Sequence, residues 1–110
     1  MDVISQDQLP FSRIASELVG DDHGWLPVSL LFIDAPPGRG PGLHTHAYHE
    51  LFIVQEGTVT FTAGDEERVV HAGEIVIVPP GTPHRFENTG EGPLRQLSVQ
   101  LSPRFVTDWL

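Results

Sequence analysis

Glycine and proline residues divide this chain into short apolar runs. Their spacing restricts the possible folds more than any other feature of the sequence. Eleven glycines and ten prolines are spread among the 110 residues. The runs between them are rich in β-branched and aromatic residues; they are Val28–Ile33, Leu51–Val54, Val59–Phe61, Val69–Val70, Ile75–Val78 and Leu97–Leu101. Strands at this spacing, with no helix-length segment between them, predict an all-β fold, either an antiparallel sandwich or a small antiparallel β-barrel.

The length of the chain fits one domain with one hydrophobic core. We expect residues 28–101 to form the barrel, residues 1–27 an N-terminal arm and residues 102–110 a C-terminal tail. One helix is predicted within the arm, at Phe11–Val19. There, Ser12 can cap the first turn, and Ile14 and Leu18 share a face.

The charge and composition of the chain exclude several partners and chemistries. Fifteen acidic residues against six basic ones give a formal net charge of −9, so we expect no binding to nucleic acid or to anionic membranes. The chain has no cysteine, which excludes disulfides and thiolate chemistry, and no lysine, which excludes Schiff bases. The first residues lack the features of a signal peptide, and no apolar run reaches the length of a membrane span, about 20 residues. These features predict a cytoplasmic protein.

A group of histidines stands directly before the run Leu51–Val54. Residues of equal parity share one face of an extended chain, so His44, His46 and Glu50 can converge. Imidazole and carboxylate ligands on one face suit a borderline divalent metal ion. The alternative is a polar loop whose histidines lie at the surface. His49 has the other parity and should face away unless a β-bulge intervenes.

His84 provides a fourth candidate ligand. It follows the rigid turn Pro79–Pro83 and begins the next predicted short strand, which runs to Glu87. Taken alone, a histidine in such surroundings is more commonly a hydrogen-bonded core residue. The two histidine segments are more informative together than either one is alone.

The residue spacing in both segments resembles the two motifs of the cupin superfamily. The first motif falls on Gly38, His44, His46, Glu50 and Gly57. The second motif falls on Gly73, Pro79, Gly81, His84 and Asn88. Every position of both spacings is matched across nearly half of the chain. The sequence is therefore similar to the small single-domain bacterial cupins.

This resemblance implies a fold and a set of ligands. Cupins fold as a jelly roll, or double-stranded β-helix, and hold a divalent metal ion through three histidines and one glutamate. Carried over position by position, the ligands would be His44, His46, Glu50 and His84. The ion would be Fe, Mn, Zn or Ni. Asn88 is expected to be a structural turn residue rather than part of the site.

The reaction is left open by the resemblance, because cupins include dioxygenases, isomerases, decarboxylases and sugar-binding proteins. We expect a metal-dependent enzyme that acts on a small organic molecule, with an oxygenase or an isomerase as the favoured class. The alternatives are a non-catalytic module that binds or senses a small molecule, and a scaffold with a vestigial site. Tyr48 is a candidate acid–base group because it is the single tyrosine of a chain without lysine or cysteine.

Strand parity also predicts the pocket around the metal. Its apolar wall is expected from Phe52, Val54, Phe61 and Phe86. Arg39 or Arg95 could orient a carboxylate on the substrate.

The last predicted strand alternates polar with apolar residues. The polar set is Gln96, Ser98 and Gln100, and the apolar set is Leu97, Val99 and Leu101. The favoured interpretation puts the apolar set in the core and the polar set in solvent, which is the usual pattern of an antiparallel sheet. The opposite orientation would place the polar set inside the barrel.

Apolar residues outside the barrel predict a homodimer. The arm and the tail carry several of them, including Phe105, Trp109 and Leu110. Small cupins commonly pair through a sheet face and exchanged edge strands, which also protects the edges from aggregation.

Overall fold

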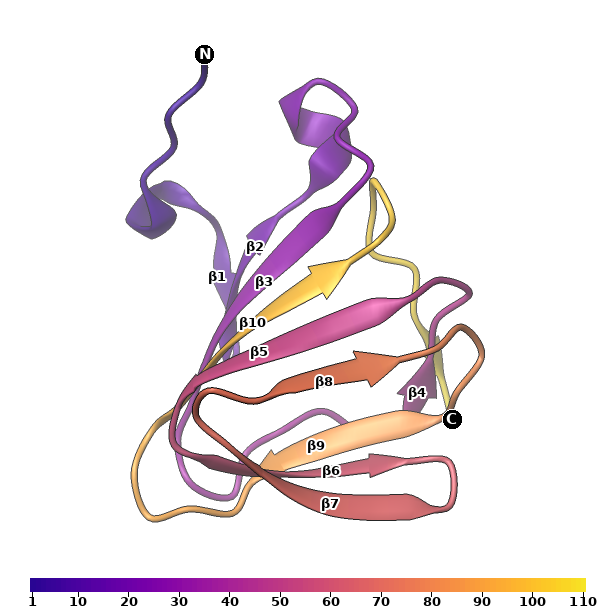
Figure 1. The fold of residues 1–110 in the computed structure, drawn as a ribbon. Helices are drawn as coiled ribbons and strands as arrows, with labels where there is room; N and C mark the ends of the chain where they lie inside the picture. The colour runs from indigo at the N-terminus through magenta and orange to yellow at the C-terminus, as the bar shows by residue number, and fades with distance from the viewer.

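The computed structural model describes every residue from Met1 to Leu110 and folds the chain into two antiparallel sheets (Figure 1). The six-stranded sheet has the order β1 (Phe11–Ser12), β2 (Ala15–Leu18), β3 (Ser29–Ala35), β10 (Leu94–Gln100), β5 (Glu50–Glu56) and β8 (Ile75–Val78). The five-stranded sheet has the order β11 (Asp108–Trp109), β4 (His44–Thr45), β9 (His84–Asn88), β6 (Thr58–Ala63) and β7 (Glu66–His71). The helical segments are two short 3-10 turns, η1 (Gln6–Gln8) and η2 (Gly20–His23).

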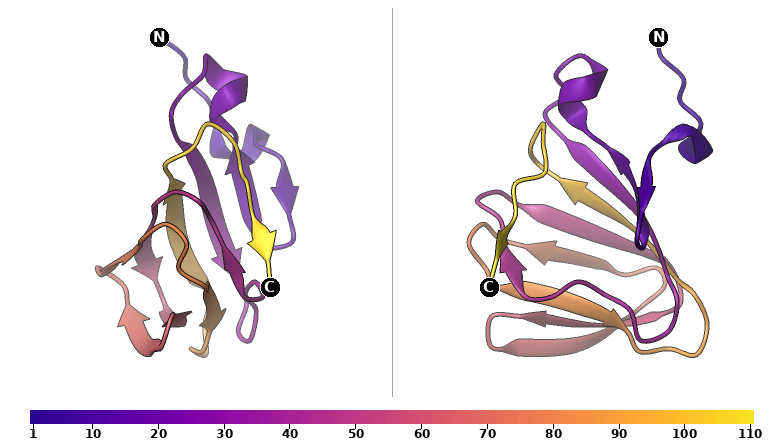
Figure 2. Two further views of the ribbon diagram at one scale, coloured as in Figure 1. Left: turned by 90° about the vertical axis from the view of Figure 1, so that its right-hand side faces the viewer. Right: turned by 180° about the vertical axis from the view of Figure 1, so that it is seen from behind.

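The chain passes repeatedly from one sheet to the other. From β3 onward, every connection changes sheet except the hairpin between β6 and β7. The two views in Figure 2 show the sheets facing each other, with the C-terminal segment beside β4. This alternation is the jelly-roll, or double-stranded β-helix, fold, and the predicted all-β class is confirmed. No helix is both long and apolar enough to cross a membrane.

The core lies between the sheets and contains eleven buried apolar residues. At its centre, Phe52, Phe61 and Phe86 contact one another with ring centroids 4.9–5.6 Å apart. The tight turn from β5 to β6 depends on Gly57, which has a φ of 94°. A Cβ atom there would lie 2.5 Å from the carbonyl oxygen of Pro93, so no larger residue fits without a shift of the backbone.

The predicted helix at Phe11–Val19 is wrong, because this segment forms the hairpin of β1 and β2. Strand β2 pairs with β3 over four residues, from Ala15 opposite Ile33 to Leu18 opposite Leu30. An isolated helix of nine residues is marginal in water, whereas pairing satisfies the backbone groups along the edge of β3. The sheet therefore determines the local structure.

The expectation for Asn88 agrees with its contacts. Its side-chain amide donates to the carbonyl oxygens of Ala35 at 2.8 Å and Gly92 at 2.9 Å. Its side-chain oxygen accepts a hydrogen bond from the backbone N–H of Gly90 at 3.0 Å. Asn88 therefore stabilises the turn that follows β9.

Candidate metal centre

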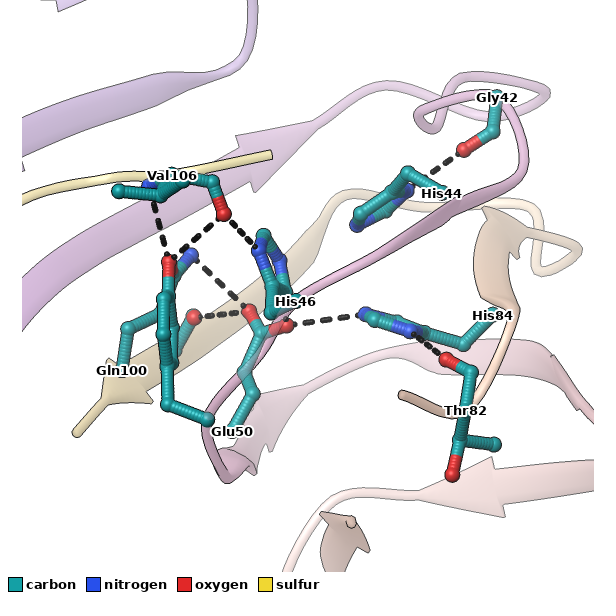
Figure 3. A network of polar contacts seen from close by, with 10 residues as sticks. Gly42, His44, His46, Glu50, Thr82, His84, Gln100 and Val106 are labelled. Atoms are coloured by element: carbon teal, nitrogen blue, oxygen red, sulfur yellow. Dashed lines mark hydrogen bonds and ion pairs between the residues drawn. The ribbon is translucent and has the colours of Figure 1, made fainter. Parts of the chain in front are cut away.

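Four buried side chains meet between the two sheets at one end of the barrel (Figure 3). His44 lies on β4, His46 follows that strand, Glu50 begins β5 and His84 begins β9. Their exposed fractions are between 1% and 6%. Each offers one ligand atom, and these atoms lie within 4.8 Å of one another. The structure thus brings together the four side chains that the cupin resemblance implies, and this cluster can hold a metal ion.

Backbone pairing places the two histidine segments side by side. His44 is the direct partner of His84 across the β4–β9 pair. The backbone N–H of Gly81 donates to the carbonyl oxygen of His46 at 2.7 Å, and Gly81 adopts a left-handed φ of 76° that favours glycine. The turn before β9 therefore attaches the second segment to the first.

All three histidine rings are oriented in the same way by backbone carbonyl groups. The Nδ1 atoms of His44, His46 and His84 contact the carbonyl oxygens of Gly42, Val106 and Thr82 at 2.7, 2.7 and 2.8 Å. A carbonyl only accepts, so each Nδ1 carries the proton and each neutral ring keeps a lone pair on Nε2. This is the arrangement by which proteins prepare histidines for a metal ion.

Glu50 is the anionic member of the cluster. Its carboxylate accepts hydrogen bonds from Ser98 Oγ at 2.5 Å and from Gln100 Nε2 at 3.3 Å, and it contacts His84 Nε2 at 3.0 Å. Burial alone would raise the pKa of Glu50, but the contacts with His46, His84 and Ser98 outweigh burial and lower its pKa to about 2. Glu50 is therefore ionised throughout the physiological range.

The donor atoms fit a cation at the centre. His46 Nε2 lies 3.2 Å from Glu50 Oε1, yet it is buried and has no hydrogen-bond partner. A neutral imidazole lone pair and a carboxylate oxygen repel each other unless a proton or a metal ion lies between them. Three imidazole nitrogens with one carboxylate oxygen suit a borderline divalent ion.

The surroundings shift the pKa values of two of the histidines in opposite directions. Burial, together with the neighbouring histidines, lowers the pKa of His44 below 6.5. Burial opposes the charge on His46 too, but the Glu50 carboxylate and the Val106 carbonyl outweigh it and raise the pKa of His46 above 6.5. His46 therefore binds protons more readily than His44.

Tyr48 lies beside the cluster rather than at its centre. Its ring stacks on that of His46, with centroids 5.0 Å apart. Its hydroxyl group lies 2.5 Å from Gln100 Oε1 and 3.2 Å from the carbonyl oxygen of Val106, and it also accepts the N–H of Val106 at 3.1 Å. These contacts occupy the group that the sequence suggested for acid–base chemistry.

The favoured interpretation of the last strand is wrong. Gln96, Ser98 and Gln100 on β10 face the interior and are buried, whereas Leu97 and Val99 are half-buried and Leu101 is exposed. The physical reason is Glu50, since a buried carboxylate requires hydrogen-bond donors, and Ser98 and Gln100 supply them. Because alternate residues of a strand share a face, Gln96 faces the interior too. Its side-chain amide has no hydrogen-bond partner there.

A cavity of about 490 Å³ opens next to the cluster and is lined by His44, His46 and Glu50 among other residues. Of the four predicted wall residues, Phe52 and Phe86 line it, while Val54 and Phe61 are buried in the core away from it.

The arginines of the cavity differ in part from those suggested by the sequence. Arg39 lines the cavity, but Arg95 lies at the surface near Asp34 and Glu56. Arg13, at the β1–β2 turn, also lines it. Sequence reasoning missed Arg13 because it treated that segment as a helix.

Comparison with known sequences identifies relatives of this chain. A sequence model of the cupin domain matches residues 31–100. The uncharacterized protein MJ1618 of Methanocaldococcus jannaschii is 35% identical over 76 residues, which are 68% of this chain and 61% of that protein. The uncharacterized protein SCO3923 of Streptomyces coelicolor is 35% identical over 78 residues, which are 71% of each chain. The chain thus spans less than two thirds of MJ1618.

Solved structures share the fold at low sequence identity. A predicted oxalate decarboxylase from Thermotoga maritima aligns with a TM-score of 0.81 and 22% identity, covering 92% of this chain and 99% of that one. The oxalate decarboxylase of Lactobacillus farciminis, in its formate complex, aligns with a TM-score of 0.80 and 19% identity, covering 94% and 34%. Fold and site together define a jelly-roll protein with a buried cluster of three histidines and one glutamate. The chain belongs to the cupin family.

Alanine variants of four histidines should separate ligands from neighbours. We expect His44→Ala, His46→Ala and His84→Ala each to lose most of the bound metal, because nothing nearby replaces the missing nitrogen. His49→Ala is the matched control, since His49 is exposed, and it should keep near-normal metal content. The measurement is metal per protomer by elemental analysis after identical purification. Equal losses in His49→Ala and His46→Ala would contradict this ligand set.

Metal affinity should fall as the pH falls, because protons compete for the histidine nitrogens. The decline should begin above pH 6.5, since the pKa of His46 is raised above that value, and should continue below it as His44 takes up a proton. The pKa of Glu50 is about 2, so its carboxylate does not contribute to the change. Chelator competition between pH 8 and pH 5 measures the affinity. An unchanged affinity over this range would argue against histidine ligation.

Proposed function

We propose that this protein is a metal-dependent enzyme that acts on a small organic anion, as an oxygenase or an isomerase. Its divalent ion, which would be Fe, Mn, Zn or Ni, would be held by His44, His46, Glu50 and His84. The observation that carries the proposal is the common orientation of the three histidine rings, whose Nδ1 atoms are all occupied by backbone carbonyl groups. An ion held by four protein ligands supplies Lewis-acid or oxygen chemistry at its remaining coordination positions.

The cavity supports a negatively charged substrate. Arg13 and Arg39 line it, and neither takes part in an ion pair, although the chain has a net charge of −9. The only carboxylates on the cavity wall are Glu50, which is held inside the cluster, and Glu17, which is beyond ion-pair distance of both arginines. Two unpaired guanidinium groups that line the same cavity as the cluster suit a small carboxylate.

The loop that carries Arg39 is held firmly. The backbone N–H of Arg39 donates to the carbonyl oxygen of Pro36 at 3.2 Å, and its own carbonyl accepts the N–H of Asn88 at 2.9 Å. A Cβ atom at the next residue, Gly40, would lie 1.9 Å from the carbonyl oxygen of Phe86, so this loop lies directly against β9. A fixed backbone with a free side chain is suited to orienting a ligand. The oxalate enzymes that share the fold are consistent with a small carboxylate substrate.

The exposed face of the six-stranded sheet supports a homodimer as the working form. Two cross-strand rows of apolar side chains run across this face. One row is Phe32, Leu97, Ile53 and Ile75, and the other is Leu18, Leu30, Val99, Leu51 and Ile77. Ile75 and Ile77 are 60% and 62% exposed. An apolar face of this kind suits a second copy of the chain placed about a two-fold axis.

The enzymatic proposal is tested by turnover with matched variants. The protein loaded with Fe(II) or Mn(II) is assayed for O₂ consumption and for isomerisation by NMR against small carboxylates, diketones, catechols and thiols. We expect turnover of a carboxylate by the wild type and by His49→Ala, and none by His46→Ala. Arg39→Gln should raise the KM for that substrate about tenfold, because a charge-assisted hydrogen bond is lost, while Arg68→Gln on β7, outside the cavity, should not. Binding of carboxylates without turnover would instead favour the sensing module.

The dimer is tested by sedimentation at micromolar protein concentration. The wild type should sediment with twice the chain mass of 12.1 kDa. Ile53→Glu places a charge in the middle of the apolar face and should give a monomer that remains folded. Val69→Glu changes an exposed residue of the other sheet and should leave the dimer intact. A wild-type mass near that of one chain would refute the dimer.

A further inference from the structure

The last nine residues of the chain run back to the metal centre and the cavity beside it. We call residues 102–110 the strap. In Figures 1 and 2 it leaves the end of β10, descends along the side of the molecule and ends beside β4. The cupin sequence match ends at residue 100, so the strap lies beyond the matched residues.

The first part of the strap is fixed to the segment around η2. The carbonyl oxygen of Pro103 accepts the backbone N–H of Asp21 at 2.8 Å, and Arg104 pairs with the Asp21 carboxylate at 2.9 Å. The hydroxyl group of Ser29 donates to the carbonyl oxygen of Ser102 at 2.9 Å. These contacts anchor the strap before it reaches the site.

The middle of the strap contacts the metal cluster directly. The carbonyl oxygen of Val106 accepts the Nδ1 proton of His46 at 2.7 Å, while the other two histidines use carbonyl groups from their own segments. The N–H of Val106 donates to the hydroxyl group of Tyr48, which contacts Gln100. Gln100 in turn donates to Glu50 at 3.3 Å. Figure 3 shows Val106 beside His46, with Gln100 and Glu50 next to them.

The end of the strap covers His44 through a very short pairing. Trp109 is the direct partner of His44 across the β11–β4 pair, and their ring centroids are 5.0 Å apart. The pairing spans two residues and one further hydrogen bond, from the N–H of Leu110 to the carbonyl oxygen of Leu43 at 3.0 Å. Trp109 remains 63% exposed. Such a short, exposed pairing opens more readily than the seven-residue ladder between β3 and β10.

We propose that the strap completes the metal centre and controls the exchange of its ion. The Val106 carbonyl keeps His46 in the tautomer that leaves Nε2 free, and Trp109 covers His44, so the ion leaves when the end of the strap separates from β4. Three strap residues, Phe105, Thr107 and Trp109, also line the cavity, so the same segment forms part of its wall. Tyr48 and the strap act through His46 and are positioning elements. This inference rests on the metal binding proposed above.

The first test measures metal release with cobalt(II) as a coloured probe. The full-length protein is saturated with Co²⁺, excess EDTA is added, and the loss of the cobalt absorption is followed. Tyr48→Phe keeps the ring stacked on His46 but removes the hydroxyl group, and Trp109→Ala removes the cover over His44. Both should still bind one cobalt ion at saturation and should release it about 10–100-fold faster than wild type, the usual effect of removing an outer partner of a ligand.

Matched controls separate this role from general destabilisation. Trp25 is the other tryptophan of the chain, is 72% exposed and does not line the cavity, so Trp25→Ala should release cobalt at the wild-type rate. Trp109→Phe keeps an aromatic ring over His44 and should restore slow release. Wild-type release rates in both Tyr48→Phe and Trp109→Ala would overturn the proposal.

A reversible crosslink gives an independent test. Asp108 on the strap is the direct partner of Thr45 on β4, and the chain has no cysteine of its own. The double variant Thr45→Cys, Asp108→Cys should form one disulfide that locks the strap onto β4 without changing any ligand. When this variant is oxidised, it should release cobalt more slowly than wild type. After reduction with a phosphine, its release rate should return to that of wild type. Equal rates in the oxidised and reduced forms would overturn strap-controlled exchange.

The two proposals can fail separately. If His44→Ala, His46→Ala and His84→Ala bind as much cobalt as wild type, the metal centre itself is wrong and the strap proposal falls with it. If those variants lose cobalt while the strap variants and the crosslink leave its release unchanged, the metal centre stands and only the role of the strap is wrong.

Discussion

The carboxylate of Glu50 lies in the interior of the barrel, where an ionised group is costly unless hydrogen bonds or opposite charge compensate it. Its hydrogen bonds come from Ser98 and Gln100 on β10. It also contacts Nε2 of His84, which begins β9 in the other sheet. One buried charge therefore connects the two sheets at the site. It also determines which side of β10 faces inward, because the strand must present its polar residues to the carboxylate.

The residues matched by the cupin sequence model and the segments outside that match contribute differently to the site. Residues 31–100 contain all four side chains of the cluster. The hairpin of β1 and β2 adds Arg13 to the cavity, and the strap adds Phe105, Thr107 and Trp109. The strap also adds the carbonyl group that orients His46. The matched residues thus provide the donor atoms, and the flanking segments add further residues to the cavity in which a ligand would lie.

Much of the architecture could be predicted from residue pattern. Apart from Val28 and Leu101, the residues of the apolar runs lie in the strands, because short β-branched segments between glycines and prolines favour strands. The spacing of His44, His46, Glu50 and His84 indicated which side chains could share one site, and the structure brings them together. The helix expected at Phe11–Val19 failed, because a nine-residue segment is controlled by the sheet edge available to it rather than by its own periodicity.

The sequence by itself determined the all-β class and the set of candidate ligands, since these depend on local preferences and fixed spacings. Tertiary structure alone decided which face of β10 is buried, because the alternation of polar and apolar residues there permits both orientations and only contact with Glu50 distinguishes them. It also decided the role of the strap. The hydrogen bond from His46 to the backbone carbonyl of Val106 joins residues 60 positions apart. Every residue has a backbone carbonyl group, so the residue types at these positions do not indicate this contact.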